Sequence, residues 1–193
     1  MNTNYILNFK HKEIFLKETG NDILKERTTS FNCGSFALNQ FYWYRPYSHG
    51  DMEECLQNIR DEYDYGSLDD YDILCNLLAR NFVKYMEYDV HCREISSEDE
   101  LEDDEYLVAF KASYNDFHYA RKFSNGQWYH KMGSQRIEPV TEEEVYSYSW
   151  WNDLSCEYGG ALHLLAVKKV DFKEERIRNN KVRRRRGGVK CFG

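Results

Sequence analysis

The sequence predicts an α+β fold in which helices come first and a mostly antiparallel sheet follows. Apolar residues recur at helical spacing in the first half of the chain, and compact apolar runs separated by turn signals follow from residue 106 on. Runs of helices followed by runs of strands are typical of α+β domains. The chain has 193 residues, of which 16% are aromatic, so it is long enough and apolar enough to form a folded domain.

Three helices are predicted in the first half. A short helix should begin at Cys33, where an apolar run starts. A second helix is predicted over residues 52–63, because Asp51 and Glu54 have the spacing of a capping box. A third is predicted over residues 68–88, with an apolar stripe that should face the core: Ile73, Leu74, Leu77, Leu78, Phe82 and Tyr85.

Strands are predicted in the second half. The acidic run at residues 96–105 is expected to be a solvated connection between the two halves. Residues 106–110 form a compact apolar run that is typical of a central strand. Residues 117–123 and 127–132 flank an Asn-Gly dipeptide, which is a strong hairpin signal. A last strand is predicted over residues 161–170.

Composition and charge indicate the extent of the domain and argue against several kinds of function. One domain is predicted over residues 1–172, followed by a basic tail over residues 173–193. The net charge of −7 argues against the body of the domain as a general nucleic-acid binder. No segment resembles a secretory signal or a membrane span, so a cytoplasmic location without a membrane partner is predicted. The six cysteines contain no CxxC pair, so we expect reduced thiols and no metal or other cofactor.

Cys33 is the candidate nucleophile. It lies where a loop should enter a helix, and the N–H groups and dipole at a helix N-terminus favour a thiolate. Gly34 would let a substrate approach the backbone closely. The backbone N–H of Cys33, or the side chain of Asn32, is the candidate hydrogen-bond donor to an oxyanion. The competing interpretation is a buried cysteine that packs as a small apolar residue.

His118 is the candidate general base. If the Asn-Gly dipeptide forms a two-residue loop, Phe123 lies opposite Trp128. Alternation then assigns His118 to the polar face of the hairpin and His130 to the core face. A histidine on the polar face could contact both a thiol and a substrate.

Three segments together carry a resemblance to a known group of proteins. Residues 32–39, 116–121 and 126–133 read NCGSFALN, DFHYAR and GQWYHKMG. They resemble a group of bacterial and phage proteins that look like papain-like Cys/His hydrolases. The resemblance implies a papain-like fold, with Cys33 as nucleophile and His118 as general base and acid. Papain-like sites also contain a residue that orients the histidine, and the candidates here are Gln135 and Asp116.

The predicted function is therefore a cysteine peptidase or amidase that acts on a protein or peptide. Cys33 would attack a carbonyl carbon to form a thioester, which water activated by His118 would hydrolyse. One alternative is a non-enzymatic interaction or inhibitor protein that binds a host protein through aromatic residues between Tyr146 and Trp151. Another is weak, salt-sensitive contact with nucleic acid through the four arginines of the tail: Arg183, Arg184, Arg185 and Arg186.

Overall fold

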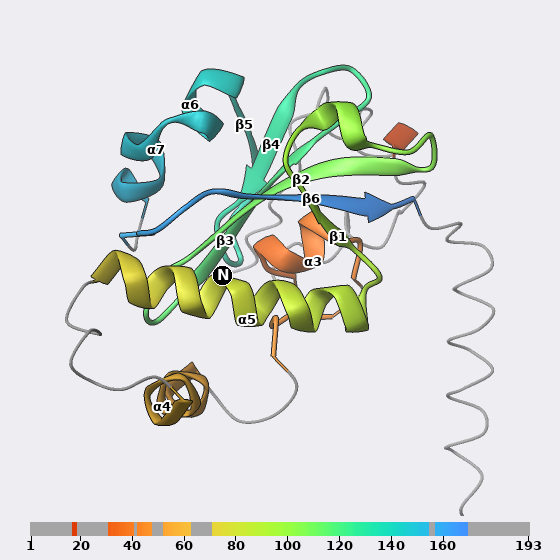
Figure 1. Cartoon of the computed structure of the whole chain (residues 1–193). Coiled ribbons are helices and arrows are strands. Elements are labelled where there is room, and N and C mark those ends of the chain that lie inside the picture. Colours follow the sequence, from red (N-terminus) through yellow and green to blue (C-terminus); the bar gives the residue numbers. More distant parts are fainter. Residues whose placement is uncertain are drawn as a thin grey trace, which may run out of the picture.

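The described part of the computed structural model forms an antiparallel sheet with helices on both of its faces (Figure 1). The predicted α+β class is therefore confirmed, whereas a papain-like architecture stays a prediction. The predicted lead-in before residue 31, apart from two residues, and the basic tail with its four arginines lie outside the described residues. The structure describes residues 17–18, 31–40, 42–47, 52–62, 71–154 and 157–169.

The sheet has six strands in the order β1-β6-β2-β3-β4-β5, and all neighbouring pairs are antiparallel. β2 is buried along its whole length, because helices cover both faces at the centre of the sheet. This double burial explains the continuous apolar run that predicted a central strand. The strands are β1 Arg93–Ile95, β2 Glu105–Ala112, β3 Phe117–Lys122, β4 Trp128–Lys131, β5 Ile137–Val140 and β6 His163–Lys168.

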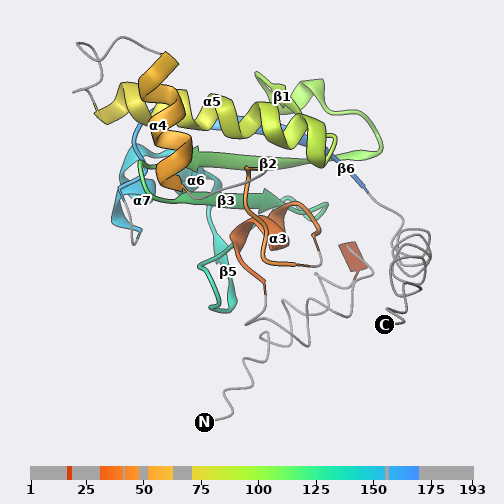
Figure 2. The ribbon, with the colours of Figure 1, turned by 90° about the horizontal axis from the view of Figure 1, so that it is seen from below.

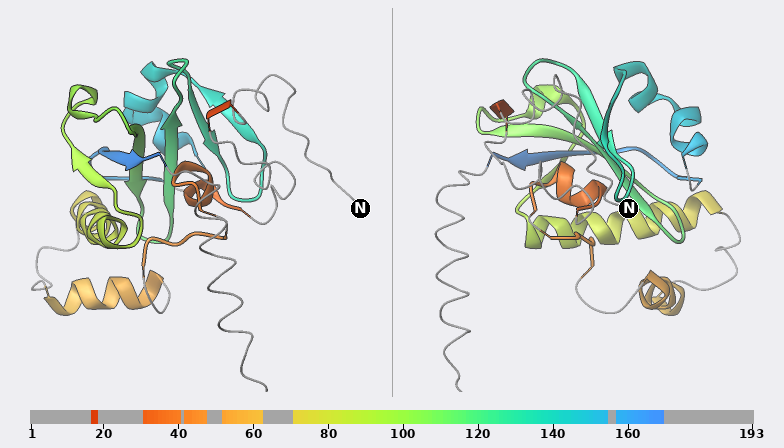
Figure 3. Two further views of the ribbon diagram at one scale, coloured as in Figure 1. Left: turned by 90° about the vertical axis from the view of Figure 1, so that its right-hand side faces the viewer. Right: turned by 180° about the vertical axis from the view of Figure 1, so that it is seen from behind.

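Three helices lie on one face of the sheet, which we call the α5 face. They are α3 (Cys33–Ala37), α4 (Met52–Glu62) and α5 (Tyr71–Asp89). α5 runs along β2, and α3 lies against β3 and β4 on the same side of the sheet (Figure 2). α4 packs on the outer side of α5 (Figure 3). All three predicted helices are therefore present.

The buried stripe of α5 differs from the predicted one. Ile73 was predicted to be in the core but is 43% exposed, while Cys75 is completely buried. The apolar residues of this helix occupy more than one stripe, so their spacing alone does not determine which stripe the sheet covers. The buried residues do follow helical spacing: Cys75, Leu78, Ala79, Phe82, Val83 and Met86.

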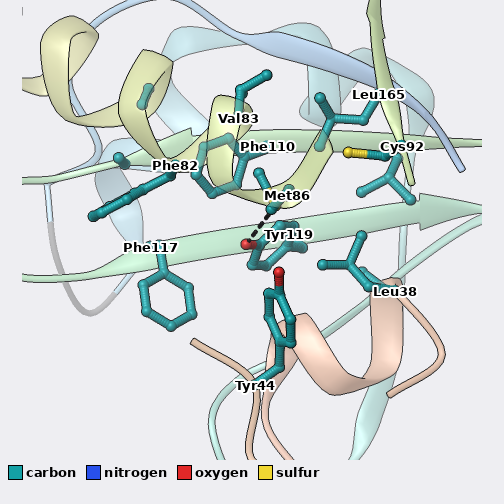
Figure 4. Close-up of a cluster of buried hydrophobic side chains, with 14 of the residues drawn as sticks. Leu38, Tyr44, Phe82, Val83, Met86, Cys92, Phe110, Phe117, Tyr119 and Leu165 are labelled. Atoms are coloured by element: carbon teal, nitrogen blue, oxygen red, sulfur yellow. Dashed lines mark hydrogen bonds between the residues drawn. The ribbon is translucent and has the colours of Figure 1, made fainter. Parts of the chain in front are cut away.

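An aromatic and aliphatic cluster fills the α5 face (Figure 4). Phe82 of α5 meets Phe110 of β2 edge-to-face, with ring centroids 6.5 Å apart, and Phe110 lies 4.7 Å from the ring of Tyr119 in β3. The Tyr119 hydroxyl donates to the sulfur of Met86 at 3.1 Å. Leu38, at the end of α3, joins the same cluster. One core therefore unites α3, α5 and the sheet.

Two short helices cover the opposite face, which we call the α7 face (Figure 1). They are α6 (Glu142–Tyr146) and α7 (Tyr148–Asp153), and both lie between β5 and β6 in the chain. The hydroxyl of Thr141 caps α6. The indole N–H of the buried Trp151 donates to the carbonyl of Val145 at 2.8 Å, which joins α7 to α6.

The register of the β3–β4 hairpin is one residue away from the predicted one. Ala120 lies opposite His130, and Lys122 lies opposite Trp128. The predicted two-residue loop would instead place Phe123 opposite Trp128. Because successive side chains of a strand point to opposite faces, a shift of one residue moves every side chain of one strand to the other face.

The turn of this hairpin explains the shift. The N–H of Phe123 donates to the carbonyl of Gln127 at 3.0 Å, and Gly126 has a φ of +79°. A longer loop with a left-handed glycine is a common alternative to the two-residue Asn-Gly turn. As a result, Trp128 and His130 lie on the α7 face and not on the predicted core face.

Candidate functional site

Cys33 begins α3 as predicted, but its thiol is enclosed in the core of the α5 face. The side chain is 5% exposed, and its Sγ donates to the carbonyl of Phe117 at 3.6 Å. Burial raises the pKa of Cys33 to about 12, with a further increase from the carboxylate of Asp116, while Gly34 and Lys131 oppose it only in part. Such a thiol is almost entirely protonated at pH 7. Cys33 therefore has the properties of a structural thiol.

His118 lies on the other side of the sheet. Phe117 and Tyr119, its neighbours in β3, belong to the cluster that contains Cys33, whereas Ala120 belongs to the cluster on the α7 face. Alternation along the strand therefore places the His118 ring on the α7 face, where it is 1% exposed. The predicted polar face for His118 is wrong, because helices cover both faces here. The structure does not bring Cys33 and His118 together.

His118 pairs with His130 instead of with Cys33. Nε2 of His118 and Nδ1 of His130 are 3.1 Å apart, so one ring donates and the other accepts. The rings of Trp150, Trp151 and Tyr158 surround the imidazoles, with centroid distances from 5.1 to 6.2 Å. The sequence prediction missed this pair because its hairpin register placed the two histidines on different faces.

Burial keeps both histidines neutral. It lowers the pKa of His118 well below the ordinary histidine value, and the neighbouring His130 lowers that pKa further. It also lowers the pKa of His130, while the carboxylates of Glu138 and Glu144 oppose this change. The pair is therefore a neutral hydrogen bond inside an aromatic enclosure at pH 7, and within the described residues the hydrogen-bond partner of His118 is an imidazole and not a thiol.

The side chain of Asn32, the predicted hydrogen-bond donor to an oxyanion, caps α3 instead. Its Oδ1 accepts the N–H of Ser35 at 3.0 Å, and its Nδ2 donates to the carbonyl of Tyr44 at 2.6 Å. The side chain is buried. Both ends of the amide thus hold the start of α3 and the loop after it, and an oxyanion role is not supported.

Of the two candidates for orienting His118, Asp116 contacts a ring that packs against His118, and Gln135 is exposed. Asp116 accepts the backbone N–H of Phe117 at 2.8 Å and the hydroxyl of Tyr158 at 2.9 Å. Through the ring of Tyr158, whose centroid lies 5.8 Å from that of His118, Asp116 is linked to the histidine indirectly. Gln135 is exposed in the turn between β4 and β5, and none of the contacts in the described residues joins it to His118.

Other residues of the three resembling segments meet in a seam between α3 and the sheet. The guanidinium of Arg121 donates to Oδ1 of Asn39 at 2.5 Å and lies 3.8 Å from the ring centroid of Tyr106. Nζ of Lys131 donates to the carbonyl of Phe31 at 2.5 Å. These contacts fasten α3 to β2, β3 and β4. In this structure, the resembling segments hold the architecture together.

An open pocket of about 630 Å³ lies on the α7 face, between the edge strand β1, the start of β6 and the end of α6. This volume is within the range of ligand sites in proteins. Apolar residues of the pocket belong to, or pack against, the buried cluster of the α7 face, and Tyr146 is 48% exposed. We call this site the Tyr146 pocket; its lining residues are Glu94, Ile95, Ser96, Tyr146, Leu162 and Leu164.

Two carboxylates and one ammonium group lie beside Tyr146. Nζ of Lys122 lies 2.6 Å from a carboxylate oxygen of Glu98 and 3.2 Å from one of Glu142. Burial is the main cause that raises the pKa of Tyr146, and Glu142 raises it further. Lys122 lowers this pKa by less than Glu142 raises it, and Glu98 adds to the increase. Two carboxylates thus face one ammonium group beside Tyr146, so the net charge of this group of three side chains is negative.

The sequence prediction singled out Tyr146 but missed the pocket around it. β1 has only three residues, which is too short for an alternating pattern to indicate a strand. The lining residues come from three separate parts of the chain, which the pairing of β1 with β6 and the packing of Tyr146 on Trp128 bring together.

A comparison with models of protein families finds none that matches the chain, and searches of curated proteins and of solved structures also find no match. Within the described residues, no helix is long and apolar enough to cross a membrane. The same part of the chain contains no group of three or more His, Cys, Asp or Glu side chains arranged to hold a metal ion.

Proposed function

We propose that this chain is a non-enzymatic protein-binding domain whose Tyr146 pocket receives a segment of its partner. The observation that supports this is an open pocket with aliphatic residues in its lining and a half-exposed tyrosine at its side. Tyrosine is enriched at protein interfaces, and exposed apolar surface in a concave site is typical of binding sites.

The cysteine hydrolase that the sequence predicts has less support from the geometry. Nucleophilic catalysis needs a thiolate and a base within hydrogen-bond reach of it. Cys33 is a buried, neutral thiol, and His118 lies across the sheet with His130 as its hydrogen-bond partner. A cysteine peptidase or amidase therefore stays a prediction from the sequence, as does nucleic-acid contact through the tail.

The proposed setting of the interaction is the cytoplasm, with a host protein as partner. Three buried cysteines in the described residues are free thiols, which is consistent with a reducing compartment: Cys33, Cys75 and Cys92. An inhibitor needs only to occupy its partner, so this role requires no catalytic residues.

Selection from a random-peptide library on the immobilised full-length protein tests the proposal. We expect the enriched peptides to bind the Leu162→Arg variant at least about tenfold more weakly, because the longer side chain would fill the pocket. Tyr146→Ala, which removes one wall, provides a second variant that does not insert a charge.

Tyr88→Ala is the matched control, because Tyr88 is 81% exposed on α5, which covers the other face. Its peptide affinities should equal those of the unchanged protein, and circular dichroism checks that all variants are folded. The proposal is refuted if no peptide is enriched, or if the enriched peptides bind the pocket variants as tightly as the control.

A further inference from the structure

We infer that the Tyr146 pocket selects a partner segment that carries a lysine or arginine beside an aliphatic residue. This inference rests on the proposed function and specifies the chemistry of the partner. Lysine and arginine have a long apolar stem and a charged head, so they bind best where an apolar surface meets carboxylates. The Tyr146 pocket combines these two surfaces.

The apolar surface comes from two neighbouring strands. Ile95 of β1 and Leu164 of β6 lie opposite each other in the sheet, and Leu162 precedes the same strand. Ile95 is part of the buried cluster of the α7 face, and the two leucines are partly buried against it. A methylene stem or a neighbouring aliphatic side chain would cover what remains exposed of these residues.

The acidic rim comes from two different elements. Glu98 belongs to the short 3₁₀ turn after β1, and Glu142 to the first turn of α6. Their side chains are about half exposed, so a partner can reach them. Lys122 is shared between Glu98 and Glu142, so one ammonium group faces two carboxylates and a net negative charge remains.

The ring of Tyr146 adds a third favourable contact. It meets Trp128 edge-to-face with centroids 6.2 Å apart and an interplanar angle of 90°, so the buried indole helps to hold its orientation. Its exposed part lies at the side of the pocket, where a cation can approach the ring. The cation would then be attracted by the ring and by the carboxylates of Glu98 and Glu142.

The negative charge of the rim favours a basic partner segment over an acidic or a neutral one. An acidic segment would bring like charges to the rim, and a neutral aliphatic segment would gain nothing from the carboxylates. We commit to a basic segment of a second protein as the occupant. The four arginines of the chain's own tail have the same chemistry, so the experiment below separates the two sources.

Fluorescence anisotropy with three labelled peptides tests the inference on the full-length protein. The first peptide alternates leucine and arginine, and the other two carry citrulline or glutamate in place of arginine. We expect the arginine peptide to bind about tenfold more tightly than the citrulline peptide, and the glutamate peptide to bind most weakly. The preference for arginine over citrulline should shrink as salt is raised from about 0.05 to 0.5 M.

A double variant, Glu98→Gln with Glu142→Gln, tests the rim. It removes both carboxylates and leaves Lys122 as an unpaired cation beside the pocket, so the arginine peptide should lose about tenfold in affinity while the citrulline peptide changes less than twofold. The matched control is Glu53→Gln with Glu87→Gln, which removes the same charge from exposed positions on the helices of the α5 face. The control should change either affinity less than twofold.

Each outcome has a distinct meaning. Equal affinities for the arginine and citrulline peptides, both lost in Leu162→Arg, would overturn the cationic preference while leaving the binding pocket in place. Absence of pocket-dependent binding by any peptide would overturn the proposed function itself. If the arginine peptide binds only after Arg183, Arg184, Arg185 and Arg186 are all changed to glutamine, the tail is the occupant and the proposal of a separate partner is wrong.

Discussion

The two faces of the sheet use similar residue types for different purposes. On the α5 face, Cys33, Asn39, Arg121 and Lys131 are all buried and bonded to the chain itself. On the α7 face, the buried His118–His130 pair lies below two short helices, and an open pocket remains beside α6. The thiol of Cys33 and the imidazoles of His118 and His130 therefore lie where solvent is excluded. The accessible Tyr146 pocket is lined instead by aliphatic, tyrosine and carboxylate residues, together with one serine.

The arrangement of the two faces does not fit the chemistry that the resemblance implies. A hydrolase needs its thiol and imidazole on one accessible face, but this sheet passes between them. Asn39, Arg121 and Lys131, which lie in the resembling segments, fasten α3 to the sheet. These residues therefore contribute to the architecture, and their presence in the sequence does not by itself assign a reaction.

The largest expected effect on stability distinguishes the buried side of α5 from its exposed side. Phe82→Ala should lower the free energy of unfolding by about 3–5 kcal/mol, because it removes a ring from the centre of the α5-face cluster. Tyr88→Ala, on the exposed side of the same helix, should change it by less than about 0.5 kcal/mol. Urea denaturation measures both. Similar losses for the two variants would show that α5 does not anchor the core.

The histidine pair predicts acid sensitivity of the α7 face. The pKa values of His118 and His130 are lowered in the folded state, so below pH 6.5 the unfolded chain binds protons that the folded protein does not. Stability should therefore be complete above pH 6.5 and fall as the pH decreases, by at most about 1.4 kcal/mol per pH unit for each histidine. Urea denaturation between pH 7.5 and 5.5 measures this loss.

A variant with both histidines replaced by leucine provides the control for this pH dependence. It should remain folded, because both partners of the buried hydrogen bond are removed together. The slope of its stability between pH 6.5 and 5.5 should be smaller than that of the unchanged protein. An unchanged slope would assign the acid sensitivity to other groups.

A smaller effect compares helix caps on the two faces. Asn32→Ala should cost about 1–2 kcal/mol, because it removes the cap of α3 and also leaves the carbonyl of Tyr44 without its amide donor. Thr141→Ala removes the exposed cap of α6 and should cost about 0.5–1 kcal/mol. Thermal or urea denaturation measures the loss in unfolding free energy of each variant. Equal losses would mean that the buried contact of Asn32 with Tyr44 adds nothing to its capping of α3.

Another small stability effect concerns the predicted nucleophile. Cys33→Ala should cost about 1 kcal/mol and should leave peptide binding at the Tyr146 pocket unchanged, because the thiol makes one weak hydrogen bond on the other face. Mass spectrometry after iodoacetamide treatment should find Cys33 labelled only slowly in the native protein and readily in urea. Rapid native labelling at pH 7 would contradict the buried thiol and favour the hydrolase again.

The sequence was informative where local pattern and structure agree. The capping-box spacing at Asp51 predicted α4, and the apolar run at residues 106–110 predicted the central strand β2. The Asn-Gly signal located the β3–β4 hairpin but predicted the wrong loop length. An error of one residue there was enough to exchange the faces of Trp128 and His130, and with them the interpretation of the candidate site.

By itself, the sequence determined the α+β class, the order of helices before strands, and the start of a helix at Cys33. These properties depend on the local spacing of apolar residues and on capping groups, which neighbours in the chain specify. Only the tertiary structure decided that Cys33 and His118 lie on opposite faces, that His118 pairs with His130, and that β1, β6 and α6 form a pocket. Those properties depend on strand register and on contacts between distant segments, and no local pattern encodes them.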